Sequence, residues 1–374
     1  MSSKKSMGLW AAISVGVGGM IGAGIFSILG TACQIAGNAV YISFILAGAV
    51  TLLSAYSYAK LGVKYPSMGG PVEFLVRGFG DGIFSGGISI LLWIGYIIAL
   101  ALYARAFAAL GFFFIKPQLL STIYFPSLNN IFYATAVLFL AYEGFGLITN
   151  TAEDMKDPAN TLPKALYLSV IIVIAIYIAV STAVVGNLSL PEIIKAQDYA
   201  LAEAVKPFLG LIGFKIMAVA ALFSTSSAIN ATLYGGANVS YMIAKEGELP
   251  EFFERKVWGK GIEGLFITAG LVILFANLFD ISKIAMLGSA SFLLIYTAVN
   301  IGHLRLYKET GANPVLIWLS ILGSLSVFIV LIYYLLNHST LTIVILSIVL
   351  LLSFGAELIY RRATKRSLKK RRCE

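Results

Sequence analysis

The sequence is poor in the residues from which soluble enzymes build their sites. Charged residues make up only 12% of its 374 positions, and it holds two cysteines and two histidines. Cys33 lies in an apolar run and Cys373 in a basic C-terminal segment, so neither a disulfide framework nor a cysteine metal site is available. His303 and His338 stand singly, without the partners that a metal site or a catalytic triad needs. We therefore expect a protein that is not an enzyme and holds no cofactor and no metal ion.

Apolar residues are in excess instead, at 59% of the total. A soluble fold of this length could not bury that much apolar surface. These residues come in continuous runs of about 20, the length of an α-helix that crosses a hydrocarbon core about 30 Å thick. They do not alternate as barrel strands do. Because a bilayer offers no water to pair with the backbone, such runs must be helices, and the sequence predicts an all-α protein that crosses a membrane many times.

About ten spans can be marked along the chain. They lie approximately at residues 8–36, 39–63, 83–115, 128–150, 161–186, 209–243, 263–280, 281–303, 313–336 and 341–360. A lysine pair before the first span is also how a signal peptide begins. The length of that span, its glycines and the span that directly follows it favour a membrane helix.

Lysine and arginine are unevenly distributed among the predicted loops. With ten spans both termini lie on one side, and about 21 of the 27 lysines and arginines fall on or next to that side, including those of the basic segment 361–374. Since cytoplasmic loops collect these residues, we expect a multi-pass protein of the cell (plasma) membrane with cytoplasmic N- and C-termini. The net charge of +9 then indicates contact with anionic lipid headgroups rather than with nucleic acid.

Glycine is the residue available to interrupt the spans, because the ten prolines lie in loops or at span ends. One glycine cluster occupies residues 16–24, and another occupies 144–146, directly after Glu143, the charged residue placed deepest in a span. Taken alone, the first cluster fits close helix packing equally well, since Gly18 and Gly22 have the small-xxx-small spacing. A dinucleotide-binding loop is a weaker alternative, because no strand precedes the glycines.

Two such clusters in different halves of the chain favour broken helices. Discontinuous spans in corresponding halves indicate a transporter's binding site near the middle of the membrane. An unwound segment exposes amides that attract a carboxylate and carbonyls that attract an ammonium group. A zwitterionic amino acid carries both charges, so the pattern predicts a site for such a ligand.

Around these clusters the sequence resembles the amino acid, polyamine and organocation (APC) transporter superfamily, particularly its prokaryotic broad-specificity amino acid permeases, over nearly the whole chain. Residues 22–26 (Gly-Ala-Gly-Ile-Phe) resemble the signature of the family's first helix. Residues 141–145, with 153–158 and 162–165, resemble the signature of its sixth helix. The loops after family helices two and eight are matched by residues 66–71 and 244–250.

The resemblance implies both a fold and a site. The fold is an inverted-repeat helix bundle, in which two five-helix repeats precede two trailing helices and helices one and six are broken. Amides around Gly22, Ala23 and Gly24 are implied to hold the substrate carboxylate, and main-chain carbonyls near Met20, Leu140, Ala141 and Glu143 its amino group. The implied substrate-binding residues are Met20, Ile21, Gly22, Ala23, Gly24, Leu140, Ala141, Tyr142, Glu143 and Gly144.

The chain departs from the family between its third and fourth spans. Only an apolar extension at 106–115 and a loop at 116–128 stand where the family has helices four and five. We therefore divide the single transmembrane domain 1–374 into a truncated first repeat (1–115), a second repeat (128–303), two trailing helices (313–360) and a basic cytoplasmic tail (361–374). Many proton-driven relatives carry a coupling lysine on helix five, and no lysine of this chain occupies such a position.

Polar residues within the spans are candidates for ion or proton coupling. A charge at bilayer depth usually lines a functional cavity, so Glu143 is a candidate for proton coupling or, if it stays ionised, for recognising a basic substrate side chain. Ser224, Ser226 and Ser227 are a possible coupling or ion site, although hydroxyls at helical spacing more often bond the preceding turn.

From these observations we expect a secondary active amino acid transporter that works by alternating access and is proton-coupled if it is coupled at all. The alternative is a substrate-binding but non-transporting paralogue or amino acid sensor, because two family helices are absent. An ion channel would need a pore-lining ring of polar residues, which the sequence does not show. Trp93 and Tyr96 are expected to pack, with lining of the substrate pocket as the alternative, and residues 187–207 to form short amphipathic helices over the outer vestibule.

Overall fold

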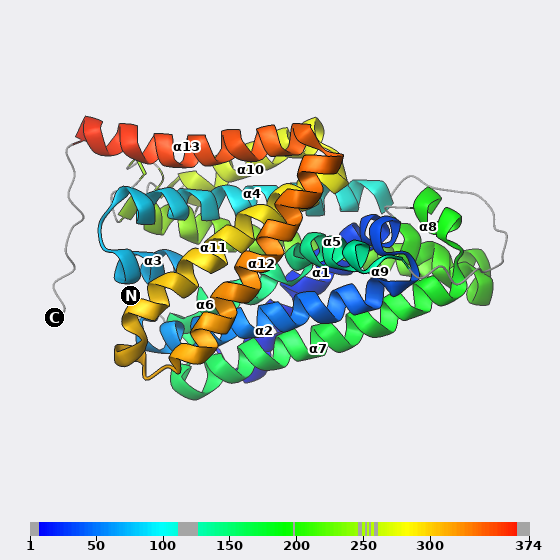
Figure 1. Ribbon diagram of the computed structural model, residues 1–374, viewed down its shortest axis with the longest axis horizontal. Coiled ribbons are helices and arrows are strands. Elements are labelled where there is room, and N and C mark those ends of the chain that lie inside the picture. The colour runs from blue at the N-terminus through cyan, green and yellow to red at the C-terminus, as the bar shows by residue number, and fades with distance from the viewer. Residues whose placement is uncertain are drawn as a thin grey trace.

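The computed structural model describes residues 7–110, 126–196, 199–245, 249, 250, 253, 256, 257 and 261–364. Long helices form a bundle, and most of them run along its long axis (Figure 1). The α-helices are α1 (Leu9–Ala36), α2 (Val40–Lys64), α3 (Pro71–Phe79), α4 (Ile83–Leu110), α5 (Leu128–Leu138), α6 (Gly146–Thr149), α7 (Pro158–Asn187), α8 (Leu190–Ala196), α9 (Ala200–Lys245), α10 (Glu263–Leu278), α11 (Ile281–Thr310), α12 (Pro314–His338) and α13 (Thr340–Thr364). The other elements are the 3-10 helices η1 (Gly37–Ala39), η2 (Phe139–Phe145) and η3 (Ala152–Asp154) and the antiparallel strands β1 (Lys256–Val257) and β2 (Gly261–Ile262).

The apolar runs of the sequence become helices of membrane length. Nine helical segments in the described part of the chain are long and apolar enough to cross a bilayer. A further apolar helix, α10, has 16 residues and so extends only about 24 Å. Together these segments account for the ten predicted spans, with α10 as the short one, and the predicted all-α polytopic architecture is confirmed.

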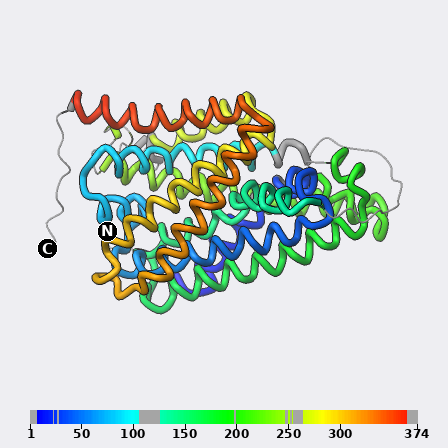
Figure 2. Tube along the Cα trace, viewed as in Figure 1, coloured from blue at the N-terminus to red at the C-terminus, as the bar shows by residue number. Residues whose placement is uncertain are grey.

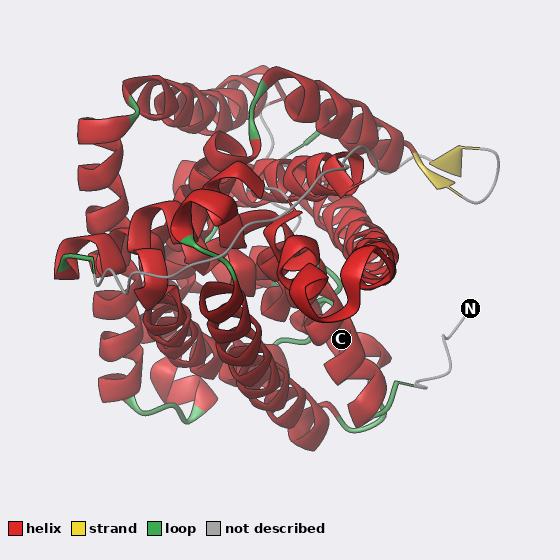
Figure 3. Cartoon of the chain, turned by 90° about the vertical axis from the view of Figure 1, so that its right-hand side faces the viewer, coloured by secondary structure: helices red, strands yellow, loops and turns green. Residues whose placement is uncertain are grey.

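Burial separates central helices from peripheral ones. In the apolar stretches of α4, of the segment from α5 to α6 and of α11, 83–89% is buried inside the protein. In those of α9, α12 and α13 the buried share is 28%. The peripheral helices expose large apolar side chains such as Phe223, Trp318 and Leu351, which suits contact with lipid. Figure 3 looks along the long axis and shows the helices largely end-on, with the two short strands projecting at one edge.

The first span is one continuous helix, which corrects the predicted break around Gly22 and Gly24. None of the glycines within α1 has a positive φ. Packing explains them: a Cβ at Gly22 would lie 2.5 Å from the Ala228 Cβ of α9, and a Cβ at Gly19 would lie 3.2 Å from the Gly144 Cα of η2. The small-residue spacing therefore serves close helix packing, which was the alternative interpretation.

The fourth span is interrupted, as predicted. The α-helix α5 ends at Leu138, the chain continues as the seven-residue 3-10 helix η2, and α6 resumes at Gly146. Runs of 3-10 helix longer than three or four residues are uncommon, and inside a helix they often mark a hinge or local strain. Two glycines near this point, each costing about 1 kcal/mol relative to alanine in an α-helix, weaken the competing α-helical conformation.

The segment after α7 folds into short helices, as predicted for residues 187–207. The first is α8, which packs against α1 and α9. The start of α9 is set apart by a kink at Gly210, whose φ of 58° is a conformation that favours glycine. Residues 197–198 of the predicted segment lie outside the described residues.

The start of α1 and the end of α13 lie at the same end of the bundle (Figure 2). The chain near the start of α1 is fixed there by the Met7 amide, which donates to the Asp154 carbonyl oxygen at 3.1 Å. Helix termini at this end carry basic residues in their first or last two turns, namely Lys60, Lys64, Lys164, Lys245, Lys308, Arg361 and Arg362.

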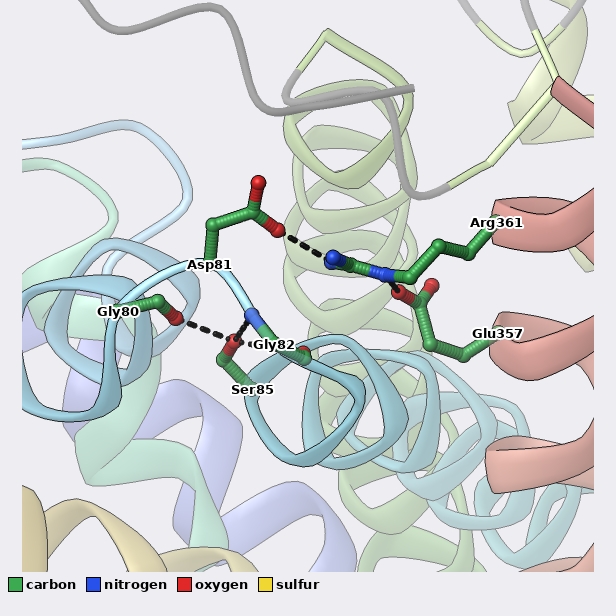
Figure 4. A network of polar contacts seen from close by, with 6 residues as sticks. All are labelled: Gly80, Asp81, Gly82, Ser85, Glu357 and Arg361. Atoms are coloured by element: carbon green, nitrogen blue, oxygen red, sulfur yellow. Dashed lines mark hydrogen bonds and ion pairs between the residues drawn. The ribbon is translucent and has the colours of Figure 1, made fainter. Parts of the chain in front are cut away.

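An ion-pair network joins the end of α13 to the loop before α4 (Figure 4). The Arg361 guanidinium contacts Asp81 in that loop and, at 3.0 Å, the carboxylate of Glu357 one turn earlier on α13. The loop itself is fixed by Ser85, whose hydroxyl donates to the Gly80 carbonyl oxygen at 2.7 Å. Glu357 is only 1% exposed, so its carboxylate is largely desolvated, and the Arg361 guanidinium balances its negative charge.

Candidate functional site

The predicted residues on the first span and on the broken span come together. A Cβ built on Gly144 of η2 would lie 2.5 Å from the Met20 amide nitrogen and 2.6 Å from the Gly19 carbonyl carbon of α1. Only a residue without a side chain allows two backbones to approach this closely. The interruption in the fourth span is therefore pressed directly against the middle of α1.

A tyrosine of α7 joins these two backbones. The Tyr177 hydroxyl lies 2.5 Å from the Met20 carbonyl oxygen and 2.9 Å from that of Ala141, and the side chain is fully buried. A hydroxyl has one hydrogen to donate, so it bonds only one of the two carbonyls at a time, and each carbonyl also accepts the backbone bond of its own helix. Both carbonyls belong to the set implied to hold an amino group, and the structure brings them to one point.

The free amides implied around Gly22, Ala23 and Gly24 are not formed in the described conformation of α1. These residues lie inside a continuous helix, in which each amide donates to the carbonyl four residues earlier. Gly24 instead provides room for the tyrosine contact, since a Cβ there would lie 2.7 Å from both the Ala141 Cβ and the Tyr177 Cζ.

Glu143 is buried beside tyrosine side chains. Its Oε2 accepts a hydrogen bond from the Tyr103 hydroxyl at 3.2 Å, and its Oε1 has no hydrogen-bond partner among the described residues. The Tyr296 hydroxyl donates to the Glu143 main-chain oxygen at 3.3 Å. Within the described part of the chain no lysine or arginine pairs with this carboxyl. A carboxyl at this depth without a cationic partner is a candidate for function rather than for structure.

A polar cavity approaches the contact between α1 and η2 from the end of the bundle where α1 begins. It has a volume of about 480 Å³ and lies between α1, the segment from α6 to η3, and α9. Its polar lining comprises Ser14, Asn150, Thr151, Asp154, Ser227, Asn230 and Tyr234. Gly18 and Leu147 line it too, so the cavity comes within one residue of the Gly19 backbone.

The remaining predicted residues lie in other surroundings. Trp93 donates its ring N–H to the Thr268 hydroxyl at 2.9 Å, and Tyr96 packs edge-to-face on Phe292 with centroids 5.7 Å apart. Both side chains thus make packing contacts.

The three serines of α9 are not gathered into one site. The Ser226 hydroxyl bonds the preceding turn, donating to the Leu222 carbonyl oxygen at 2.7 Å. The Ser224 main chain packs against Gly22, and Ser227 alone of the three lines the cavity.

The sequence did not identify Tyr177, Tyr103 and Asn150 as candidate site residues. The sequence could have indicated Tyr177, since a buried tyrosine hydroxyl needs a partner and this one lies well inside an apolar helix of 30 residues. Asn150 is 3% exposed and its side-chain amide makes no well-formed hydrogen bond within the described structure, although it lines the cavity. Its place one residue past α6 could not be read from the sequence.

Comparison with known proteins identifies the family. A model of a family described as amino acid permease matches residues 119–354. The chain belongs to this amino acid permease family. It is 40% identical to an uncharacterized protein of Methanocaldococcus jannaschii, over 97% of each chain. It is 29% identical to the inner membrane transport protein YbaT of Escherichia coli, over 96% of this chain and 97% of the relative. It is 24% identical to the serine/threonine exchanger SteT of Bacillus subtilis, over 66% of this chain and 70% of the relative.

Membership of the amino acid permease family confirms the resemblance to the APC superfamily. With the apolar helices and the transporter names of the relatives, it makes this family member a multi-pass membrane transporter and not an enzyme. The first two alignments extend over 423 and 419 positions, more than the 374 residues of this chain. Both relatives therefore carry residues that this chain lacks.

Proposed function

We propose that this permease-family member is a secondary active transporter of amino acids that works by alternating access. The observation that carries the proposal is the convergence of the Met20 and Ala141 carbonyls on the Tyr177 hydroxyl. Two carbonyls that share one side-chain donor at one buried point are suitable acceptors for an ammonium group in its place, since an ammonium group offers three donors. The name of one relative, a serine/threonine exchanger, agrees with an amino acid substrate.

The polar cavity supports a route to this point from the end of the bundle where α1 begins. It reaches Gly18 and Leu147, while the next residue, Gly19, is in close contact with Gly144. Opening the contact between α1 and η2 would join the cavity to the Tyr177 hydroxyl. We propose that this movement is the step that admits or releases substrate on that side.

The same end of the bundle is proposed to face the cytoplasm of a plasma membrane. The helix termini there are rich in lysine and arginine, which collect on the cytoplasmic side of membrane proteins. At the opposite end the helices and their connections carry few described cations, among them Arg105, Lys195 and Lys283. A reporter fused after residue 374 should be active only in the cytoplasm, and an external reporter signal would overturn the orientation.

Glu143 is proposed to carry a proton during transport. Among the described residues, Tyr103 is the one side chain that donates a hydrogen bond to its carboxyl, and the Glu143 Oε1 has no partner there. An isolated carboxyl in such surroundings can be discharged by taking up a proton. The rival proposal is that Glu143 stays ionised and pairs with a basic substrate side chain.

The second candidate is a substrate-binding paralogue or sensor that does not transport, on the proposal that this chain lacks two family helices. The supporting observation is that the M. jannaschii relative is aligned over 423 positions against the 374 residues of this chain, which leaves at least 49 positions without a counterpart here. That number is close to two spans of about 20 residues with their connection. Binding of amino acids without uptake would select this candidate.

The proposed function is tested by uptake of labelled amino acids into proteoliposomes, with and without a proton gradient. We expect accumulation that depends on the gradient. In Glu143→Gln, which keeps the shape but cannot ionise, exchange of internal for external substrate should persist while gradient-driven accumulation is lost. Selective loss of lysine and arginine uptake would favour the rival role for Glu143. Absence of both uptake and binding across the panel would overturn the proposed function.

A further inference from the structure

A second cavity lies between α2, α7 and α11, at the same end of the bundle as the start of α1. Its volume is about 450 Å³, and its polar lining is formed by Tyr56, Lys60, Lys64, Tyr167 and Thr310. The three helices are neighbours at this end (Figure 1), with α2 in contact with both α7 and α11. None of the residues assigned to the substrate site lines this cavity.

The charge of the cavity lining is positive. Lys60 and Lys64 are its charged side chains, and no acidic residue is part of the described wall. Lys60 is half-buried and its ammonium group donates to the Gly311 carbonyl oxygen at 3.3 Å, so the side chain is held in place. The nearby carboxylate of Glu309 is engaged by the Tyr65 hydroxyl at 2.6 Å.

Two other polar groups of the wall, the hydroxyls of Tyr56 and Thr310, are fixed by contacts behind them. The Tyr56 hydroxyl accepts a hydrogen bond from the Asn313 amide at 2.7 Å. The Thr310 hydroxyl lies 2.9 Å from the Nε2 of His303, a side chain with no exposed surface. A cationic pocket with positioned hydroxyls is therefore already formed without a ligand.

From its place near the ends of three spans, we infer that the cavity lies at the depth of a membrane interface. It is built from the last residues of α2 and α11 and the first turns of α7, where these spans leave the apolar region. Tyrosines are enriched at this level because their rings are apolar and their hydroxyls are polar. One helical turn beyond Tyr167, Ile171 is 52% exposed and continues the same face of α7 into the zone of acyl chains.

We propose that this cavity binds the headgroup of an anionic phospholipid. The two lysines would contact the phosphate, the hydroxyls of Tyr167 and Thr310 would bond its oxygens, and the acyl chains would follow α7 past Ile171. Its volume falls within the range of about 300–1,000 Å³ of small-molecule sites. Basic pockets between spans on the cytoplasmic side are a known way to recognise such headgroups.

The test is binding of single lipids to the purified full-length protein, measured by native mass spectrometry in a neutral detergent. Phosphatidylglycerol and phosphatidylcholine with identical acyl chains are compared for the wild type and for the double variant Lys60→Gln, Lys64→Gln. We expect the preference for phosphatidylglycerol to fall roughly 5- to 25-fold, about fivefold for each lysine removed. The matched control is Lys156→Gln, Lys245→Gln, which removes two exposed cations at the same end outside the cavity and should leave the preference unchanged.

Two further arms identify the source of the phosphate. Inorganic phosphate and glycerol phosphate at the same concentrations should not bind measurably, because they lack the acyl chains that α7 contacts. Binding of either as tight as that of the lipid would overturn the lipid assignment. An equal loss of preference in the control pair, or an unchanged preference in the cavity pair, would overturn the site. Midpoints of thermal unfolding measured without lipid confirm that each variant is folded.

Discussion

Replacing Tyr177 by phenylalanine separates the role of its hydroxyl from that of its ring. The hydroxyl is the donor that Met20 and Ala141 share. Removing a buried hydrogen bond costs about 0.5–1.5 kcal/mol, and pairs within membrane proteins average about 0.6 kcal/mol. We therefore expect the free energy of unfolding of the substrate-free protein to fall by about 0.5–1.5 kcal/mol.

The same substitution should tighten substrate binding. If the amino group of the substrate takes the place of the hydroxyl, the bound state of Tyr177→Phe loses nothing while the free state is destabilised. The free-energy difference then appears as a Kd lower by about 2- to 10-fold. Unfolding in denaturant and equilibrium binding of labelled substrate measure the two effects.

Ser43→Ala is the matched control, because the Ser43 hydroxyl of α2 is also buried but donates to the Ile131 carbonyl oxygen of α5 at 2.8 Å. It should lower stability by a similar amount and leave the Kd unchanged. Unchanged or weaker substrate binding by a folded Tyr177→Phe protein would refute the placement of the amino group at Met20 and Ala141.

Two further pairs of substitutions test a close packing contact and the Arg361 ion-pair network, all by denaturant unfolding. Gly144→Ala places a methyl group 2.5 Å from a backbone nitrogen of α1 and should lower the free energy of unfolding by about 1–3 kcal/mol. Gly355→Ala, where nothing lies within 4 Å, should be neutral or raise it by up to about 1 kcal/mol; equal effects would contradict the close contact. Arg361→Gln leaves the buried Glu357 carboxylate without its cation and should cost about 1–3 kcal/mol, whereas Asp81→Asn should cost under about 1 kcal/mol.

The spans were predictable because a bilayer imposes a single requirement on every crossing segment. Twenty or so apolar residues in a row suffice to predict a helix there. The apolar run at α10 also forms a helix, although that helix is shorter than a full span. The basic helix ends likewise follow from the charges of the membrane surface.

The two glycine clusters adopt different structures although their sequence patterns are similar. Glycine permits both an unwound backbone and a close helix contact, and its intrinsic cost of about 1 kcal/mol is small beside the packing of a long helix. At 144–146 the chain is interrupted, whereas around Gly22 the contact with Ala228 of α9 keeps the helix continuous. The outcome at Gly22 depends on a residue 206 positions away in the sequence, and the contact of Gly144 is with Gly19 and Met20, more than 120 positions away.

The contact made by Tyr177 could not be derived for a related reason. Its partners are main-chain carbonyls, which every residue possesses, so no side-chain pattern encodes them. Their exposure to the hydroxyl depends on the approach of η2 to α1, which is a property of the folded bundle.

The central claim is that an amino acid binds where α1 meets η2. Equilibrium binding of a labelled amino acid substrate to Gly24→Leu tests it most directly, because a Cβ at Gly24 would lie 2.7 Å from the Tyr177 Cζ and the Ala141 Cβ. The control is Gly186→Leu at the exposed end of α7, where nothing lies within 4 Å. We predict that Gly24→Leu inserts and remains monodisperse but loses binding, while Gly186→Leu binds as the wild type does. Wild-type affinity in Gly24→Leu would contradict the account.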